Sequence, residues 1–98
     1  MGKLYKIDGT VTEITPKDPK RGFTLEECYG YIRCNLIDAK CLGEDENGVE
    51  TWFICDDEGL LKDSPIYNLR ATKRARDISG LAWELFGNVI ICSGEEFK

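Results

Sequence analysis

Short β-rich runs broken by turn-forming pairs are the feature that most constrains how this chain can fold. Asp8-Gly9 interrupts the run Lys3–Ile14, and Asn47-Gly48 stands directly before the run Val49–Cys55. Both pairs favour tight turns, and such turns join antiparallel strands. The sequence therefore predicts a hairpin or a kinked strand over the first run and a hairpin centred on Asn47-Gly48.

Two further runs extend the predicted sheet. Tyr31–Ile37 alternates between apolar and polar residues, as in a strand with one buried face, whereas Asn88–Cys92 has the composition of a buried strand. Alternation along Val49–Cys55 places Phe53 and Trp52 on opposite faces. If Phe53 faces the core, a helix or a ligand must cover Trp52 on the second face of the sheet.

One short segment carries both a helix start and a helix stop. Thr24 and Glu27 match a capping box, and Phe23 can pack against Cys28 as a hydrophobic staple. Gly30 is suited to the left-handed conformation that ends many helices. A short helix is therefore predicted to end at this glycine.

A second helix is predicted over Ile66–Arg76, because Ser64-Pro65 resembles an N-cap followed by proline at the first helical position. Asp77–Gly87 has helical spacing of apolar residues, but Gly80 weakens a helix there, so helix and strand both stay open. The 98 residues fit one domain, 1–98. Its predicted class is α+β, a small, mostly antiparallel β-sheet with one or two short helices.

The five cysteines are odd in number and mostly embedded in apolar runs, which indicates buried thiols in a reducing compartment. No apolar run reaches the roughly 18–20 residues of a membrane helix, and the first seven residues lack the apolar core of a signal peptide. The chain is therefore expected in the cytoplasm, without a membrane partner.

Several kinds of chemistry are disfavoured by composition. Histidine is absent, which removes the commonest general base near neutral pH, and the cysteines lack the close pairing of zinc ligands. We therefore expect no enzymatic activity, no metal site and no cofactor. The net charge of −5 opposes non-specific attraction to nucleic acid, which ranks nucleic acid behind other partners.

A local basic cluster runs against this net charge. If a helix begins near Ser64, then Arg70, Lys73 and Arg74 share one face by their three- and four-residue spacing, and Arg76 follows them. Such a face can hold phosphates, since arginine offers forked donors. The alternative is an ordinary solvated helix, because phosphate-tracking surfaces usually carry more than four charges.

An acidic cluster, Glu44, Asp45 and Glu46, precedes the Asn47-Gly48 turn. Acidic residues in turns usually stay in water, but such a cluster can also mimic nucleic acid phosphates and occupy a basic groove on another protein. Together with Trp52, these three acids form the predicted surface for a protein partner.

The order of the predicted segments is also informative. The helix and strand over 24–37 are followed by Ile54–Leu61 (ICDDEGLL), Pro65–Thr72 (PIYNLRAT) and Gly87–Gly94 (GNVIICSG). This order, over residues 24–94, resembles the family named domain of unknown function 3846. Its members are small proteins of bacteria, phages and plasmids, so the resemblance implies an accessory protein of phage or mobile-element type.

The resemblance also ranks the possible functions. Small acidic phage proteins often bind a host protein or a host signalling nucleotide and thereby blunt a defence system. The first expectation is therefore a non-catalytic binder that acts as an anti-defence inhibitor. The alternative is a nucleic-acid or nucleotide-binding module that uses Arg70, Lys73, Arg74 and Arg76, and a homo-oligomer would join two weak patches into one site.

Overall fold

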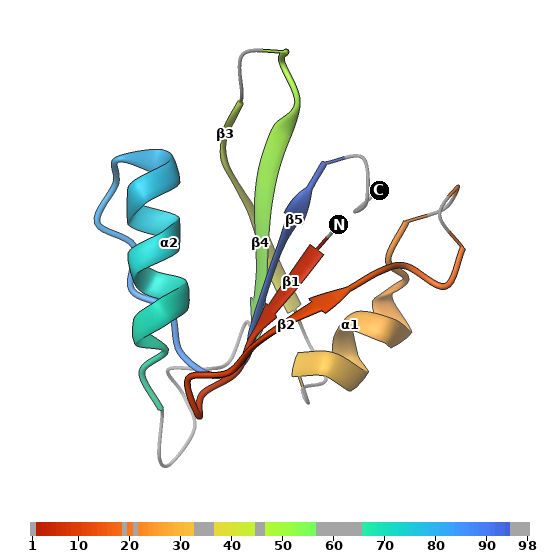
Figure 1. The fold of residues 1–98 in the computed structure, drawn as a ribbon, viewed down its shortest axis with the longest axis horizontal. Coiled ribbons are helices and arrows are strands. Elements are labelled where there is room, and N and C mark those ends of the chain that lie inside the picture. The colour runs from red at the N-terminus through yellow and green to blue at the C-terminus, as the bar shows by residue number, and fades with distance from the viewer. Residues whose placement is uncertain are drawn as a thin grey trace.

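A five-stranded antiparallel sheet with one helix on each face forms the fold (Figure 1). The computed structural model describes residues 2–18, 20, 22–32, 37–44, 47–56 and 66–94. In chain order the elements are β1 (Gly2–Tyr5), β2 (Val11–Ile14), α1 (Leu25–Ile32), β3 (Ile37–Glu44), β4 (Glu50–Asp56), α2 (Leu69–Ser79) and β5 (Val89–Ser93). The sheet order is β2-β1-β5-β4-β3, so the predicted α+β class is confirmed.

Both predicted hairpins are confirmed. The Asp8 carboxylate accepts a hydrogen bond from the Thr10 amide at 2.8 Å in the turn that joins β1 to β2. Gly48 adopts φ 78° in the turn between β3 and β4, where glycine is favoured because it has no Cβ. The predicted strand near the C-terminus is also confirmed, since β5 lies at the centre of the sheet and pairs with β1 and β4.

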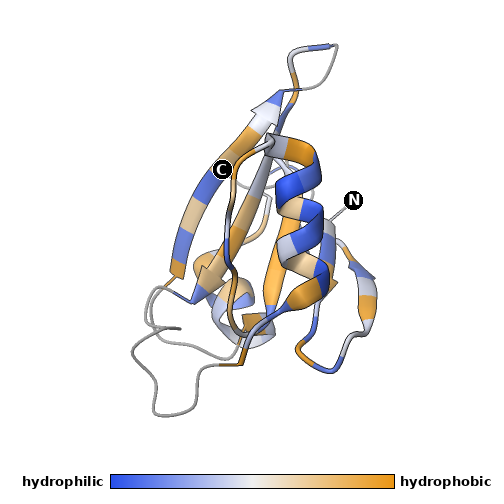
Figure 2. Cartoon of the chain, turned by 90° about the vertical axis from the view of Figure 1, so that its left-hand side faces the viewer, coloured by the Kyte–Doolittle hydropathy of each residue, from blue (hydrophilic) through white to orange (hydrophobic). Residues whose placement is uncertain are grey.

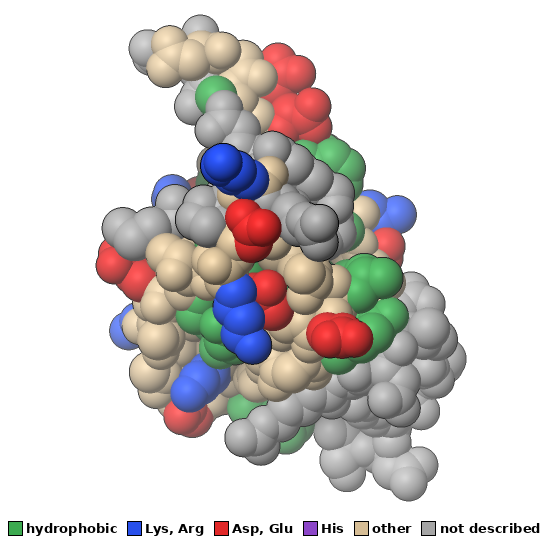
Figure 3. Space-filling view, turned by 90° about the vertical axis from the view of Figure 1, so that its right-hand side faces the viewer, with side chains coloured by type: hydrophobic (Ala, Val, Ile, Leu, Met, Phe, Trp, Pro, Cys, Tyr) green, Lys and Arg blue, Asp and Glu red, His purple; other side chains and the backbone are tan. Residues whose placement is uncertain are grey.

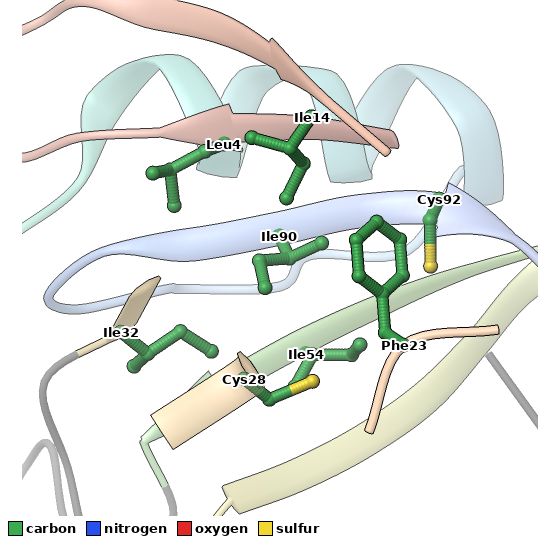
Figure 4. Close-up of a cluster of buried hydrophobic side chains, with 8 residues drawn as sticks. All are labelled: Leu4, Ile14, Phe23, Cys28, Ile32, Ile54, Ile90 and Cys92. Atoms are coloured by element: carbon green, nitrogen blue, oxygen red, sulfur yellow. The ribbon is translucent and has the colours of Figure 1, made fainter. Parts of the chain in front are cut away.

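Each face of the sheet buries its own apolar cluster. The cluster under α1 is shown in Figure 4 and consists of Leu4, Ile14, Phe23, Cys28, Ile32, Ile54, Ile90 and Cys92. The cluster under α2 consists of Tyr5, Leu42, Phe53, Ala71, Ala75, Leu85, Val89 and Ile91. Neighbouring positions on β4 and β5 contribute to opposite clusters because strand side chains alternate between faces. Figure 2 shows α2 against the sheet with its hydrophilic side turned outward.

The prediction of a strand over Tyr31–Ile37 is wrong. Tyr31 and Ile32 belong to α1, residues 33–36 lie outside the described part, and β3 begins at Ile37. The Thr24 hydroxyl accepts a hydrogen bond from the Glu27 amide at 3.1 Å, so the predicted helix start is confirmed. The helix continues through Gly30 because Cys28 and Ile32, one turn apart, are both buried against the sheet.

The second helix begins later than predicted. Its N-cap is Asn68, whose side chain accepts from the Ala71 amide, and Ser64-Pro65 lies outside the described residues. The helix ends at Gly80, which adopts φ 72°. Asp77–Ser79 is therefore helical, whereas the chain over 81–88 is irregular except for a bridge between Tyr67 and Phe86.

Two further expectations are tested by the fold. Cys28 and Cys92 are buried and Cys55 is half-buried, but Cys41 is exposed, so the prediction of buried thiols is wrong for Cys41. Cys41 is exposed because β3 is an edge strand with a bulge beside it. No helix in the described part of the chain is long and apolar enough to cross a membrane.

Candidate functional site

The outer face of α2 presents three of the four predicted cations. Arg70, Lys73 and Arg74 are exposed, whereas Ala71 and Ala75 are buried against the sheet. The N-cap is Asn68 and not Ser64, but the three cations still share one face because their relative spacing is unchanged.

Arg76 has a different role from the other three cations. Its Nε donates to the Trp83 carbonyl oxygen at 2.9 Å, and its guanidinium lies 3.9 Å from the Glu84 carboxylate. These contacts hold the segment that follows α2 against the helix. Arg76 therefore stabilises the fold, which is a role that the sequence did not suggest.

A groove of about 280 Å³ opens beside α2 and over the sheet. It is lined by Lys3, Tyr5, Val49, Thr51, Arg74, Ile78, Ile91, Cys92 and Ser93. Two of these described residues are cationic and none is acidic. The groove therefore brings Arg74, from the predicted basic face, together with Lys3, which the sequence did not single out.

The strand register explains why these residues meet. Lys3 on β1 pairs with Ile91 on β5, and Ser93, two residues further on, pairs with Thr51 on β4. Positions two apart on a strand share a face, so this side of the sheet presents a row with Lys3 and then a row of two hydroxyls. Ala71 and Ala75 let α2 approach the sheet closely, and Arg74 and Ile78 form the wall of the groove.

The charges in the groove suit an anion. Within the described part of the chain, neither Lys3 nor Arg74 has an ion-pair partner. Thr51 and Ser93 add hydroxyl groups, which can donate hydrogen bonds to an oxyanion. On the side of the molecule turned away from α2, acidic and basic side chains are interspersed (Figure 3).

A second, larger hollow lies along α1 and has the opposite character. Its volume is about 720 Å³, and its lining residues are Lys17, Asp18, Thr24, Glu26, Glu27, Gly30 and Tyr31. Three of these are carboxylates and one is a lysine, so the hollow does not favour an anionic ligand. Glu27 also accepts from the Lys17 amide at 3.4 Å, which links α1 to the preceding loop.

The predicted protein-binding surface is brought together only in part. Glu44 is exposed at the end of β3, and Asp45 and Glu46 lie outside the described residues. Trp52 is half-buried, and its indole nitrogen donates to the Glu50 carboxylate at 3.0 Å. Gly94 approaches the same indole so closely that an added Cβ would lie 3.3 Å from its nitrogen. Glu50 and Gly94 therefore contribute to the burial of Trp52.

The exposed thiol of Cys41 is not activated for nucleophilic chemistry. Desolvation raises the pKa of the Cys41 thiol above its usual value, and a hydrogen bond with the Glu50 side chain raises this pKa further. The thiolate is the reactive form, so a raised pKa lowers the reactivity near neutral pH. Among the described residues, no three Cys, Asp or Glu side chains gather as a metal site.

Replacing Glu50 with glutamine is therefore expected to speed the alkylation of Cys41. Glutamine removes the negative charge that disfavours the thiolate, yet its carbonyl oxygen can still accept from the Trp52 indole. Iodoacetamide labelling at pH 7.5, followed by peptide mass mapping, should show a severalfold faster rate at Cys41. Glu26→Gln, an exposed change on α1, serves as the control. Equal rates for Glu50→Gln and the parent would contradict this account of the Cys41 pKa.

No protein-family model, curated protein or solved structure matches this chain. The resemblance to domain of unknown function 3846 therefore stays a prediction.

Proposed function

We propose that this chain is a non-catalytic binding domain that holds a phosphate-bearing ligand in the groove beside α2. One observation carries the proposal: Lys3 and Arg74, from distant parts of the sequence, line the same groove, and no acidic residue from the described part of the chain lines it with them. Arginine and lysine are the usual protein partners of phosphate oxygens. In a chain of net charge −5, a groove of this kind concentrates the positive charge in one place.

Binding without turnover is supported by the chemistry of the same groove. The chain has no histidine, and the groove offers hydroxyls and cations but no described carboxylate that could act as a base toward a hydroxyl nucleophile. The exposed thiol, Cys41, has a raised pKa. We extend the proposal to the cellular role: an accessory protein of phage or mobile-element type that sequesters a phosphate-bearing host signal in the cytoplasm.

The alternative of acidic mimicry of nucleic acid has less support. This alternative would place Glu44, Asp45 and Glu46 in a basic groove of a host protein. Of these three residues, only Glu44 belongs to the described part of the chain. Glu50 and Trp52 are already bonded to each other. The groove beside α2 is therefore the better-supported site.

Reversing the charge of Arg74 tests the proposal. For any phosphate compound that binds the parent protein, Arg74→Glu is expected to weaken binding roughly 100-fold, since a charge-assisted hydrogen bond contributes about 1.5–3 kcal/mol and the new carboxylate repels the ligand. Isothermal titration calorimetry with sodium tripolyphosphate, AMP and a 20-nucleotide single-stranded DNA gives the measurement.

Two controls make this experiment decisive. Glu26→Gln, an exposed change on α1 at the other face of the sheet (Figure 1), should alter affinity by less than about twofold, because screened surface charges far from the groove contribute little. The parent should also lose affinity steeply as salt is raised. Failure of all three compounds to bind the parent, or equal binding by Arg74→Glu, would refute the proposed function.

A further inference from the structure

We infer that the groove takes a single nucleotide, with its phosphate at the Lys3 and Arg74 end and its base at the Val49 and Ile78 end. This inference rests on the proposed function and specifies the ligand class for the same site. Three features support it: the order of chemical groups along the groove, the burial of the one aromatic side chain in the described lining, and the size of the hollow.

The order of groups follows from the strand register. The first row across the five strands contains Glu13, Lys3, Ile91, Phe53 and Lys40, and of these Lys3 and Ile91 line the groove. The next row contains Ser93, Thr51 and Gly43. Side chains in successive same-face rows are roughly 6.6 Å apart along the strand. Within the groove, Lys3 is therefore followed by a hydroxyl row, and Val49 lies beyond both.

The helical wall repeats this order. Ile78 lies one turn after Arg74, and a turn advances about 5.4 Å along the helix axis. An added Cβ on Gly43 would lie 3.8 Å from the Ile78 carbonyl oxygen, which places Ile78 beside the hydroxyl row. Arg74 is therefore positioned beside the row that contains Lys3. Both walls change from charged to apolar in the same direction, which matches the phosphate, ribose and base of a nucleotide.

The same contact brings α2 and the sheet together beside the groove. Ile78 on α2 meets β3 at Gly43, which belongs to the hydroxyl row. A polynucleotide must enter and leave its site, and non-specific strand-binding grooves combine several cations with exposed aromatic platforms. The single aromatic side chain that lines this groove, Tyr5, is 7% exposed. The geometry therefore favours a ligand that ends inside the groove.

The size of the hollow agrees with a small ligand. Its volume of about 280 Å³ is close to the lower limit of roughly 300 Å³ for small-molecule pockets. Inorganic phosphate would leave the apolar end empty, and a polynucleotide would extend far beyond it. Val49, Ile78 and Ile91 offer apolar surface to a base, whereas Thr51 and Ser93 offer hydroxyls to a ribose.

Calorimetric titration with four probes tests the ligand class. The probes are AMP, ribose 5-phosphate, inorganic phosphate and a 20-nucleotide single-stranded DNA. AMP is expected to bind at least tenfold more tightly than ribose 5-phosphate and inorganic phosphate, and more tightly than the DNA per molecule. Equal affinity for AMP and ribose 5-phosphate would overturn the placement of the base.

Three variants locate the parts of the ligand. Lys3→Gln should weaken binding of both AMP and inorganic phosphate about tenfold, because each loses the same charge-assisted contact. Thr51→Val, which keeps the shape of the side chain, should weaken AMP threefold or more and leave inorganic phosphate unchanged. Arg70→Gln, one turn before Arg74 and outside the groove lining, is the matched control and should change neither affinity by more than twofold.

Different results would refute the single-nucleotide inference and the proposed phosphate binding. Tight binding of the DNA without binding of AMP would overturn the single-nucleotide inference and leave phosphate binding in place. A normal AMP affinity in Lys3→Gln would also overturn the inference, because the phosphate would then lie elsewhere. Absence of binding by every phosphate probe would remove the proposed function itself.

Discussion

Replacing Asn68 with alanine is expected to lower the free energy of unfolding by about 3–5 kcal/mol. Asn68 is 2% exposed, and its amide nitrogen donates to the carbonyl oxygens of Tyr5 and Gly87 at 2.9 and 2.8 Å. Its side-chain oxygen caps α2 by accepting from the Ala71 amide. Alanine loses an N-cap worth about 1 kcal/mol and leaves two carbonyls without this donor, at about 1–3 kcal/mol each.

Urea unfolding of three variants measures this effect and separates its causes. Asn68→Asp retains an oxygen that can cap α2 but loses both donors, so it should be destabilised about as much as Asn68→Ala. Asn88→Ala is a matched control, because half-buried Asn88 also bonds two backbone groups, Ile7 N–H and the Tyr31 carbonyl. It should lose only about 1 kcal/mol, since those groups lie nearer to water. A similar loss of unfolding free energy in Asn68→Ala and Asn88→Ala would contradict the conclusion that the buried hydrogen bonds of Asn68 stabilise the fold more than those of Asn88.

Truncating Phe53 to alanine is expected to cost about 3–5 kcal/mol of unfolding free energy, because it removes a large side chain from a packed core and leaves a cavity. Phe53 is 2% exposed on β4. Its ring lies 5.1 Å from that of Trp83, centroid to centroid, with the planes at 70°, so the change also removes an edge-to-face contact.

The size of the remaining side chain should set the size of the loss. Phe53→Leu keeps most of the apolar volume and is expected to lose less, about 1–2 kcal/mol. Both variants should shift the midpoint of urea unfolding while the slope stays constant. A loss below 1 kcal/mol for Phe53→Ala would show that the cluster under α2 is not packed as described.

The parts of the fold that were predicted correctly depend on neighbouring residues. Asp8-Gly9 and Asn47-Gly48 form turns through their own backbone conformations, and Thr24 caps α1 through a bond three residues away. The strand over Tyr31–Ile37 was predicted wrongly because apolar alternation there competes with a helical pairing of Cys28 with Ile32. Burial against the sheet decides between the two, and the local sequence does not contain that information.

The start of α2 shows the same limit. Ser64 and Asn68 are both suitable N-cap residues, so the local pattern alone does not choose between them. Asn68 caps the observed helix and also bonds the carbonyls of Tyr5 and Gly87, which are distant in sequence. These long-range bonds give Asn68 a role that its own neighbourhood in the sequence does not reveal.

Of the candidate site, only the cations on α2 were predicted from the sequence. The basic face of α2 follows from the spacing of Arg70, Lys73 and Arg74, and the structure confirms that they are exposed together. Lys3 could not be assigned to the same site, because its place depends on the pairing of β1 with β5, from opposite ends of the chain. Turn signals predict which consecutive strands pair, but they do not predict a sheet order of β2-β1-β5-β4-β3.

An amide chemical-shift titration of ¹⁵N-labelled protein with AMP tests the central claim, binding of a phosphate ligand in the groove beside α2, most directly. The account predicts saturable shifts that are largest for the amides of Lys3, Thr51 and Arg74, and that are lost in Arg74→Glu. The amides of Glu26 and Glu27 on α1, at the other face of the sheet (Figure 1), should shift least. Shifts centred on α1, or no shifts with either AMP or sodium tripolyphosphate at millimolar concentration in low salt, would contradict the account.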